Sequence, residues 1–487
     1  MRTLTLYNNG RSVAFGNIPQ TSDYHEFAQY VHEAMVNEAY HCVAYFGYPN
    51  ADALQLIMCL ANDANGTVEV FSFVLKEKSC PSLKIRAIDR FEREIAENFG
   101  IVFEGHQWPK PVRTAPDDYP FYRADDEELH EVGVGPIHAG VIEPGHFRFT
   151  CEGEKILNLE IMLGYQHRGV EKLMLEKPML SQKAMLAESV AGDSAVSHGI
   201  AFATNFEALC DYQIDERGAV ERMIACELER MAIHTGDLSA ICGDVAYQLG
   251  NAVYGRLRTP IINFMQKWCG NRLGKTMIRP FEAPYDLTPE LIADLHATLN
   301  AYEKDFTQMS NKIKRCPSVL SRLERTGTVS REQVVEMGTV GMASRASGLS
   351  RDIRCTHPYL KYENQVKPVV KKHGDVYSRT QVRIEEVYES LALIRKLIDN
   401  LPVAQASKVA EPQLQANRFA LSLVEGWRGE ICHCAITDNS GKLALYKIKD
   451  PSFHNWDALE MAVRNNEISD FPICNKSFNL SYCGHDL

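Results

Sequence analysis

The sequence predicts an α+β protein in which a compact N-terminal α/β unit precedes a larger, mainly helical unit with peripheral β-hairpins. Strand and helix patterns alternate over residues 1–106, prolines interrupt the chain after that, and long apolar stripes at helical spacing dominate the rest. With 487 residues, of which 45% are apolar and 24% charged, the chain has an ordinary globular balance and enough length for several cores.

The N-terminal unit is expected to cover residues 1–106. Three runs rich in β-branched and aromatic residues predict strands; they are residues 42–46, 54–60 and 68–75. Apolar residues at helical spacing predict a helix at the end of the unit; they are Ile88, Phe91, Ile95 and Phe99.

Residues 107–130 are expected to form an extended linker. Prolines at positions 109, 111, 116 and 120 prevent regular hydrogen bonding, and the acidic cluster 125–128 favours solvent.

The second unit is expected to cover residues 131–487 and to open with a hairpin that pairs residues 146–151 with 156–163. Helical stripes follow over residues 220–238, 291–313 and 384–394, and Thr288 and Pro289 give the second of them an N-cap and a first turn. A second hairpin, with residues 438–441 as its turn, pairs 431–437 with 443–448.

Composition restricts the class of protein. The net charge of −11 argues against nucleic acid as a partner, because that role usually needs a clustered basic face. The N-terminus lacks the apolar core of a signal peptide, and the longest apolar run is far too short to cross a bilayer. We therefore expect a location in the cytoplasm.

The fourteen cysteines contain no C-x-x-C pair, which fits a reducing compartment. Cys432 and Cys434 are the closest pair, and a strand there would place both on one face with His433 on the other. Packing inside a sheet is favoured over a metal clip.

The helix at the end of the first unit runs into Phe99-Gly100-Ile101, and with its flanks, residues 92–106, resembles the signature E-R-E-x-x-D-x-F-G-I-x-F-x-G-H. That signature is typical of the small hydrophilic subunit of respiratory complex I, which formate hydrogenlyase-type enzymes fuse to their large subunit. Residues 131–487 resemble nickel–iron hydrogenase large subunits and the quinone-site subunit of complex I, as in the run from Gly164 to Leu173.

The resemblance also locates two metal-ligand segments, which family members write as E-R-V-C-G-I-C-x-x-x-H and D-P-C-x-x-C. In this chain they correspond to residues 188–198 and to the tail 477–487. The four thiolate positions fall on Ala191, Ser194, Ser481 and Gly484. Since thiolates donate the charge that a nickel–iron centre needs, the resemblance implies that this centre is lost and that the chain binds no cofactor of its own.

Two polar residues of the family site have counterparts here. The resemblance assigns to Glu143 the proton relay away from the metal and to Arg428 the position over the iron ligands. Glu143 as an exposed turn residue and Arg428 as a structural ion-pair partner remain equally open. We expect both to line one cavity with the two ligand segments, with Asp193, Ser194 and Ser481 as polar contacts.

A replacement metal site built from Asp193, His198, Cys483 and His485 is the weaker alternative. Packing of His198 inside a helix and solvation of the tail histidine are favoured over it. The quinone pattern of complex I is missing as well, because its tyrosine position falls on Glu188 and its histidine loop carries Glu143.

The resemblance implies a peripheral subunit, on the cytoplasmic side of the cell membrane, of an ion-translocating respiratory oxidoreductase complex without a nickel–iron site. Its partners would be a small subunit with an iron–sulfur cluster and a membrane arm related to ion antiporters. A quinone- or sulfur-reducing role and a purely structural or conformational-coupling role are the alternatives, so enzymatic activity of the chain itself stays open.

Overall fold

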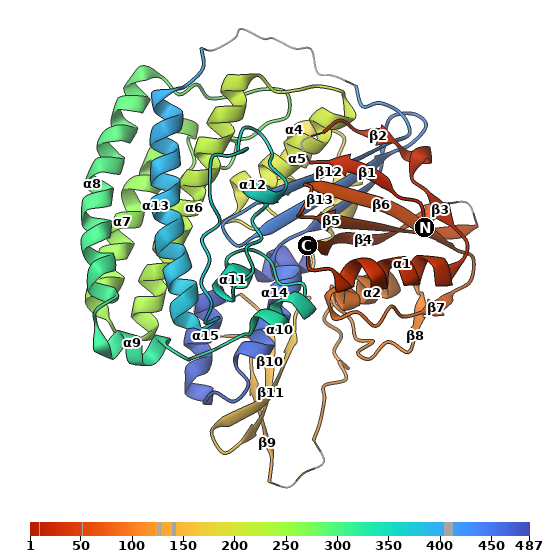
Figure 1. Cartoon of the computed structure of the whole chain (residues 1–487), viewed down its shortest axis with the longest axis horizontal. Helices are drawn as coiled ribbons and strands as arrows, with labels where there is room; N and C mark the ends of the chain where they lie inside the picture. The colour runs from red at the N-terminus through yellow and green to blue at the C-terminus, as the bar shows by residue number, and fades with distance from the viewer. Residues whose placement is uncertain (9, 51, 125, 127, 139–142, 404–412) are drawn as a thin grey trace.

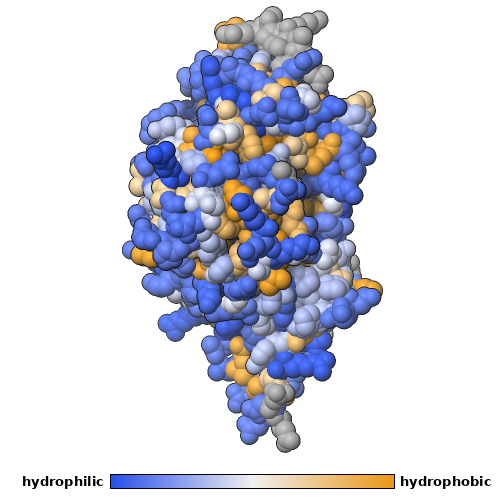
Figure 2. Space-filling model, turned by 90° about the vertical axis from the view of Figure 1, so that its right-hand side faces the viewer, coloured by the Kyte–Doolittle hydropathy of each residue, from blue (hydrophilic) through white to orange (hydrophobic). Residues whose placement is uncertain are grey.

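The computed structural model covers residues 1–487 and describes all of them except 9, 51, 125, 127, 139–142 and 404–412. A bundle of long helices lies on one side of the molecule and an N-terminal sheet on the other, with the C-terminus between them (Figure 1). Seen from the side of the N-terminal sheet, the surface is mostly hydrophilic, with apolar residues gathered near its middle (Figure 2).

The N-terminal sheet has the strand order β1-β6-β5-β4, and β3 pairs with β6 in parallel while the other pairs are antiparallel. Its elements are β1 (Leu4–Tyr7), β3 (Gln20–Thr21), α1 (Tyr24–Val36), β4 (Tyr40–Asn50), β5 (Ala53–Asn62), β6 (Thr67–Leu75) and α2 (Arg86–Phe99). The predicted strands and helix at these positions are therefore confirmed.

Both faces of this sheet are covered, which explains why its strands read as continuous apolar runs rather than as alternating patterns. On one face, Phe27 of α1 and Phe91 of α2 pack against the strands. On the other face, Val43 and Cys59 belong to the main core of the protein.

A second sheet, of order β14-β13-β12-β2, is antiparallel throughout and combines both ends of the chain. It consists of β2 (Val13–Ala14), β12 (Arg418–Glu425), β13 (Glu430–Thr437) and β14 (Leu443–Lys449). The predicted C-terminal hairpin is thus confirmed. Cys432 and Cys434 lie on one face of β13 with their sulfur atoms 3.8 Å apart in the buried core, as expected for packing inside a sheet.

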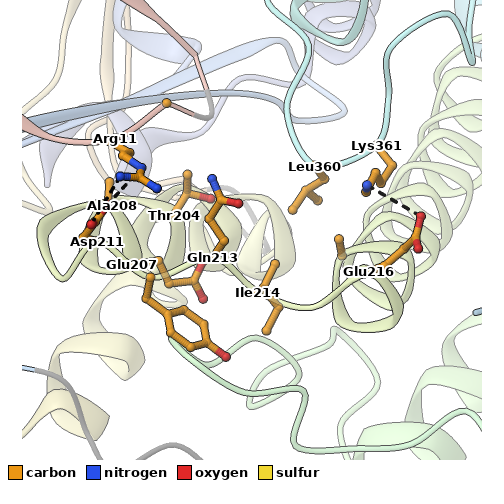
Figure 3. A pocket seen from close by; sticks show the side chains of 13 residues that line it. Arg11, Thr204, Glu207, Ala208, Asp211, Gln213, Ile214, Glu216, Leu360 and Lys361 are labelled. Carbon is orange, nitrogen blue, oxygen red and sulfur yellow. Dashed lines mark hydrogen bonds and ion pairs between the residues drawn. The ribbon is translucent and has the colours of Figure 1, made fainter. Parts of the chain in front are cut away.

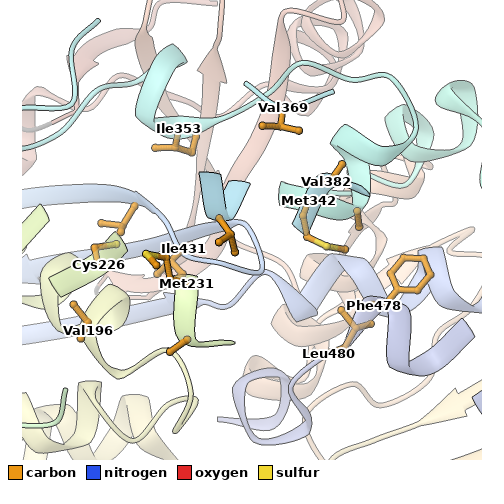
Figure 4. Close-up of a cluster of buried hydrophobic side chains, with 14 of the residues drawn as sticks. Val196, Cys226, Met231, Met342, Ile353, Val369, Val382, Ile431, Phe478 and Leu480 are labelled. Carbon is orange, nitrogen blue, oxygen red and sulfur yellow. The ribbon is translucent and has the colours of Figure 1, made fainter. Parts of the chain in front are cut away.

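Long helices form the bundle that supports the rest. They are α5 (Ala195–Leu209), α6 (Glu216–Asp244), α7 (Gln248–Cys269), α8 (Pro289–Ile313) and α13 (Val376–Asp399). The hydroxyl of Thr288 accepts a hydrogen bond from the Leu291 N–H, which confirms the predicted N-cap of α8. Apolar residues from α5, α6, β13 and the C-terminal segment meet in one core (Figure 4).

Shorter elements connect these layers. Three strands form a separate antiparallel sheet, and a small parallel pair flanks α2; they are β9 (His130–Val134), β10 (His146–Glu152), β11 (Lys155–Met162), β7 (Ser79–Pro81) and β8 (Val102–Glu104). The predicted pairing of β10 with β11 is confirmed. The short helices that precede α13 in the sequence are η1 (Phe15–Asn17), α3 (Val170–Glu176), α4 (Leu180–Ala187), α9 (Pro317–Leu323), α10 (Arg331–Glu336), α11 (Gly341–Ala346) and α12 (Ile353–Thr356). Those after it are α14 (Ser452–Ala462), η2 (Ile468–Asp470), α15 (Phe471–Phe478) and α16 (Tyr482–Asp486).

The described part of the predicted linker has no helix or strand before β9, but it is fixed to the protein. Arg113 donates to the Glu94 carboxylate at 2.7 Å and to the backbone carbonyl of His485. Lys110 pairs with Glu160 at 2.6 Å. Residues 125 and 127 of the acidic cluster lie outside the described residues. Within those residues, no helix has the length and apolar content required to cross a membrane.

Candidate functional site

Three segments far apart in the sequence meet at the N-terminal end of α5. They are the 188–198 run, the tight turn that joins β12 to β13, and the tail around α16. Gly426 and Gly429 hydrogen-bond to each other in this turn, so Trp427 and Arg428 stand at its tip. Gly429 has φ +142°, a conformation that side chains other than glycine rarely adopt.

Arg428 links all three segments. Its guanidinium donates to both carboxylate oxygens of Asp193, at 2.7 and 2.5 Å, and to the Ser194 hydroxyl at 3.3 Å. Its Nε donates to the backbone carbonyl of Asn479 at 2.6 Å. The side chain of Arg428 is 5% exposed and that of Asp193 is 32% exposed. Asp193 stands where the resemblance places the isoleucine of the C-G-I-C segment.

All four former ligand positions are buried. Their two segments are linked through Arg168, which donates to the carbonyls of Val190 and Cys483. The hydroxyl of Ser481 accepts from the Gly484 N–H at 2.9 Å and caps α16. A Cβ atom at Gly484 would lie 2.7 Å from the carboxyl carbon of Asp450. A cysteine at 484 would therefore collide with Asp450.

His198 lies in a buried hydrogen-bonded row of α5, β13 and β14. Its Nε2 lies 3.1 Å from the Asp450 carboxylate, and its Nδ1 lies 3.0 Å from His433. His433 in turn contacts the Tyr446 hydroxyl at 2.9 Å. Although burial alone would raise the pKa of Asp450, the hydrogen bond and charge of His198 and the charge of Arg428 lower it to about 2. Burial and His198 hold the pKa of His433 well below its usual value.

Glu143 is half-buried beside the tail. Burial and then the charge of Glu143 raise the pKa of the Cys483 thiol, and burial together with a smaller contribution from Glu143 raises the pKa of Tyr482. Glu143 therefore lies near both residues. Arg168 fixes the same corner, because it donates to the backbone carbonyls of Ser189, Val190 and Cys483.

Two expectations need correction or closer definition. The tail histidine, His485, is not solvated as expected: it is 1% exposed and contacts Arg90 of α2 at 2.9 Å. Burial lowers its pKa to about 4. Glu188, at the tyrosine position of the quinone pattern, pairs with Arg279 at 2.5 Å.

The donors at this site do not fit a centre held by four thiolates, since the four positions carry methyl, hydroxyl and hydrogen groups. The geometry gives no support to the weaker alternative of a replacement site. Over the described residues, no group of three or more His, Cys, Asp or Glu side chains has an arrangement that holds a metal ion. Asp193, His198 and His485 instead have separate partners in Arg428, Asp450 and Asp486.

A separate cavity of about 180 Å³ lies between the first loop of the chain, the end of α5 and the start of α6. Arg11 pairs with Asp211, and Lys361 pairs with Glu216, across its rim (Figure 3). None of the residues that line it belongs to the site described above.

Sequence reasoning missed the roles of Arg168, His433 and Asp450. Asp450 and Arg168 stand in segments that resemble the family, but nothing local indicates that they reach residues hundreds of positions away. Alternation along β13 places His433 on the opposite face from Cys432, and that alternation is the available signal for its contact with α5.

Comparison with known proteins agrees with the two-part organisation. Residues 19–126 match the family model "Respiratory-chain NADH dehydrogenase, 30 Kd subunit", and residues 249–419 match "Respiratory-chain NADH dehydrogenase, 49 Kd subunit". Formate hydrogenlyase subunit 5 of Escherichia coli is 29% identical over 380 residues, which are 77% of this chain and 66% of the relative. The C/D subunit of NADH-quinone oxidoreductase from Phocaeicola vulgatus is 31% identical over 359 residues, 71% of this chain and 67% of the relative.

The chain therefore belongs to the family of fused 30-kDa and 49-kDa-type subunits found in complex I and in the related hydrogenases. It spans about two thirds of the length of these two relatives. A solved structure of the membrane-bound sulfane sulfur reductase, an archaeal respiratory membrane complex, shares the fold with a TM-score of 0.69. That likeness covers 75% of this chain and 100% of the other chain at 20% identity.

Proposed function

We propose that this chain is a peripheral subunit of a membrane-bound, ion-translocating respiratory oxidoreductase complex related to energy-converting hydrogenases and complex I. Its relatives include formate hydrogenlyase, membrane-bound hydrogenase and NADH-quinone oxidoreductase subunits, which supports this class of assembly. In this proposal the former metal position no longer binds a metal. Its charged residues instead take part in proton or conformational coupling to the other subunits.

The Arg428–Asp193 pair carries this part of the proposal. The resemblance places the guanidinium of Arg428 over the ligands of a metal. In this structure the same guanidinium is paired with the carboxylate of Asp193. A buried guanidinium needs such a partner, because an uncompensated charge in the interior is costly. The charge of Arg428 is therefore compensated by Asp193 without a metal.

The expected partners are a small subunit with an iron–sulfur cluster and membrane-arm subunits related to ion antiporters, and the expected location is the cytoplasmic side of the membrane. Exposed apolar side chains on α3 and α4, the helices that precede the 188–198 run, support a protein partner there. Met179 and Met185, at the start of α4 and within it, are 54% and 59% exposed, and Leu175 of α3 is 39% exposed.

Purification of the tagged chain from its native membranes tests the proposal. We expect it to co-purify with an iron–sulfur protein and with membrane-spanning subunits, and to leave the membrane only when those contacts are broken. The chain expressed alone should not float with liposomes. Flotation of the isolated chain, or purification without partners under mild conditions, would contradict the peripheral-subunit role.

A redox role is the second candidate. It requires that the small-subunit partner retain its cluster-binding cysteines, whereas a purely structural role predicts that these are lost. Iron and acid-labile sulfide measured on the purified complex separate the two.

A further inference from the structure

A cluster of buried charges lies directly behind the turn that carries Arg428. Its seven charged side chains are each at most 1% exposed. They come from α6, α11, α13, the end of β12 and α12 with its N-cap, and are Glu227, Arg230, Arg345, Asp352, Arg354, Glu386 and Glu425. We call these seven residues the bundle charge cluster.

Arg345 lies at the centre of the cluster. It donates to Glu386 at 2.6 Å and to Glu425 at 2.7 Å. Arg354 pairs with Asp352 at 2.8 Å and with Glu227 at 3.1 Å. The third arginine completes the network, because its Nε lies 3.2 Å from Glu227 and its Nη1 lies 3.6 Å from Glu386.

The charges of the cluster do not balance when every carboxyl is ionised. Three arginines, which stay protonated in proteins, face four carboxyl groups. His234 contacts Glu386 at 2.8 Å, but burial lowers its pKa, so its neutral form is favoured. Since an uncompensated buried charge is strongly unfavourable, one carboxyl should hold a proton near neutral pH.

The geometry singles out Glu425. Each of the other three carboxyls pairs with two arginines in the described structure, whereas Glu425 pairs with Arg345. Its second oxygen accepts from the Ile353 N–H at 3.1 Å. Burial raises the pKa of Glu425 to about 7. Arg345 opposes this rise, the negative charge of Asp352 adds to it, and Arg230 makes a smaller opposing contribution.

Further titratable groups at the edge of the cluster add no charge of their own. Cys355, Tyr359 and Tyr362 carry pKa values that burial raises, so their neutral forms are favoured.

A chain of contacts connects the cluster with the site. Arg428 donates to the carbonyl of Asn479, whose side-chain amide donates to Asp237 at 2.7 Å. Asp237 pairs with Arg383 at 2.9 Å. Arg383 stands three residues before Glu386 of the cluster on α13, and Glu386 contacts His234.

We propose that Glu425 is a proton-binding site of this subunit and that its occupancy responds to the charge of the Arg428–Asp193 pair. A change in the charge of the pair would shift the affinity of the cluster for a proton, and by linkage the proton would affect the pair by the same free energy. The biological role of this proton rests on the proposed function. The occupancy itself is a property of the chain alone.

Infrared difference spectroscopy of the purified full chain across neutral pH tests the site. We expect a protonated-carboxyl band that titrates near neutral pH and is missing in Glu425→Gln. The matched control is Glu460→Gln, which removes a half-buried carboxyl whose pKa desolvation raises to about 7 and leaves the Glu425 band in place. An unchanged set of titrating bands in Glu425→Gln would overturn the proposal.

Asp352→Asn provides a second test that does not require removal of Glu425. With three arginines and three carboxyls left, ionised Glu425 balances the charge, so the midpoint of its band should fall by at least about one pH unit. An unchanged midpoint contradicts the charge-balance argument even if Glu425→Gln fails to fold.

The connection to the Arg428–Asp193 pair has its own test. Asp193→Asn removes a negative charge and should lower the midpoint of the Glu425 band, and Arg428→Gln should raise it. No shift in either variant would overturn the coupling. Neither result depends on the partner subunits, so a failure here is distinguishable from a failure of the proposed function.

Discussion

The guanidinium of Arg428 holds both carboxylate oxygens of Asp193, although 235 residues separate the two in the sequence. The pair fixes the tip of the β12–β13 turn to the start of α5.

Asp193→Asn should lower the free energy of unfolding by about 2 kcal/mol, because Arg428 would keep its charge in a buried position with a weaker partner. Urea denaturation of both proteins measures the difference. The matched control is Asp211→Asn, whose ion pair with Arg11 is exposed at 41% and 72%, and which should cost less than about 0.5 kcal/mol. Equal effects of the two variants would show that Asp193 is only a surface partner.

Gly484→Ala should destabilise the protein by about 1–3 kcal/mol, since its Cβ would lie 2.7 Å from the Asp450 carboxyl and displace it from His198. Gly192→Ala is the control, because nothing lies within 4 Å of a Cβ at that position. Thermal unfolding of the two variants compares them. A neutral effect at Gly484 would mean that Asp450 moves freely.

The purified protein should contain no nickel, because the four aligned positions are Ala191, Ser194, Ser481 and Gly484 and supply no thiolate. Elemental analysis of protein produced with nickel in the medium measures this. A content near one nickel atom per chain would refute the prediction.

Glu143→Gln should impair ion translocation by the whole complex while its assembly stays intact. The substitution keeps the shape of the side chain and removes a titratable proton beside Tyr482 and Cys483. Translocation into membrane vesicles and the set of proteins in the purified complex are the two measurements. Normal translocation would favour the purely structural role.

Glu229→Gln should change how stability depends on pH. The Glu229 side chain accepts hydrogen bonds from the Val196 and Ser197 N–H groups at the start of α5. Burial raises the pKa of this carboxyl to about 7. The folded state therefore binds the proton more tightly than the unfolded state. The contribution of Glu229 to the free energy of unfolding is fully present below the unfolded pKa. It falls by about 1.4 kcal/mol per pH unit between the unfolded and the folded pKa, and it is lost above about pH 7.

Unfolding free energies at about pH 6 and about pH 8 measure this effect, because the window spans the raised pKa. The decrease with rising pH should be smaller in Glu229→Gln than in the unmodified protein. An identical decrease in both would show that Glu229 is ionised throughout. The difference between the two proteins cancels the histidines, which titrate in both.

The local elements of this protein could be predicted from its sequence. Thr288 with Pro289 fixed the start of α8, and the apolar runs at 42–46, 54–60 and 68–75 fixed three strands, because these signals act over a few residues. The loss of the thiolate positions was equally readable, since it follows from residue identity at Ala191, Ser194, Ser481 and Gly484.

Only the tertiary structure decided which charges meet. No local pattern connects the segments that meet in these features. They are the pairing of Arg428 with Asp193, the contact of His198 with Asp450, the buried environment of His485 and the partners of Glu425. The physical reason is that burial makes an unpaired charge costly, so each side chain takes the partner that the packed helices and sheets bring within reach. Sequence determines the groups available, and packing determines their partners and hence their protonation.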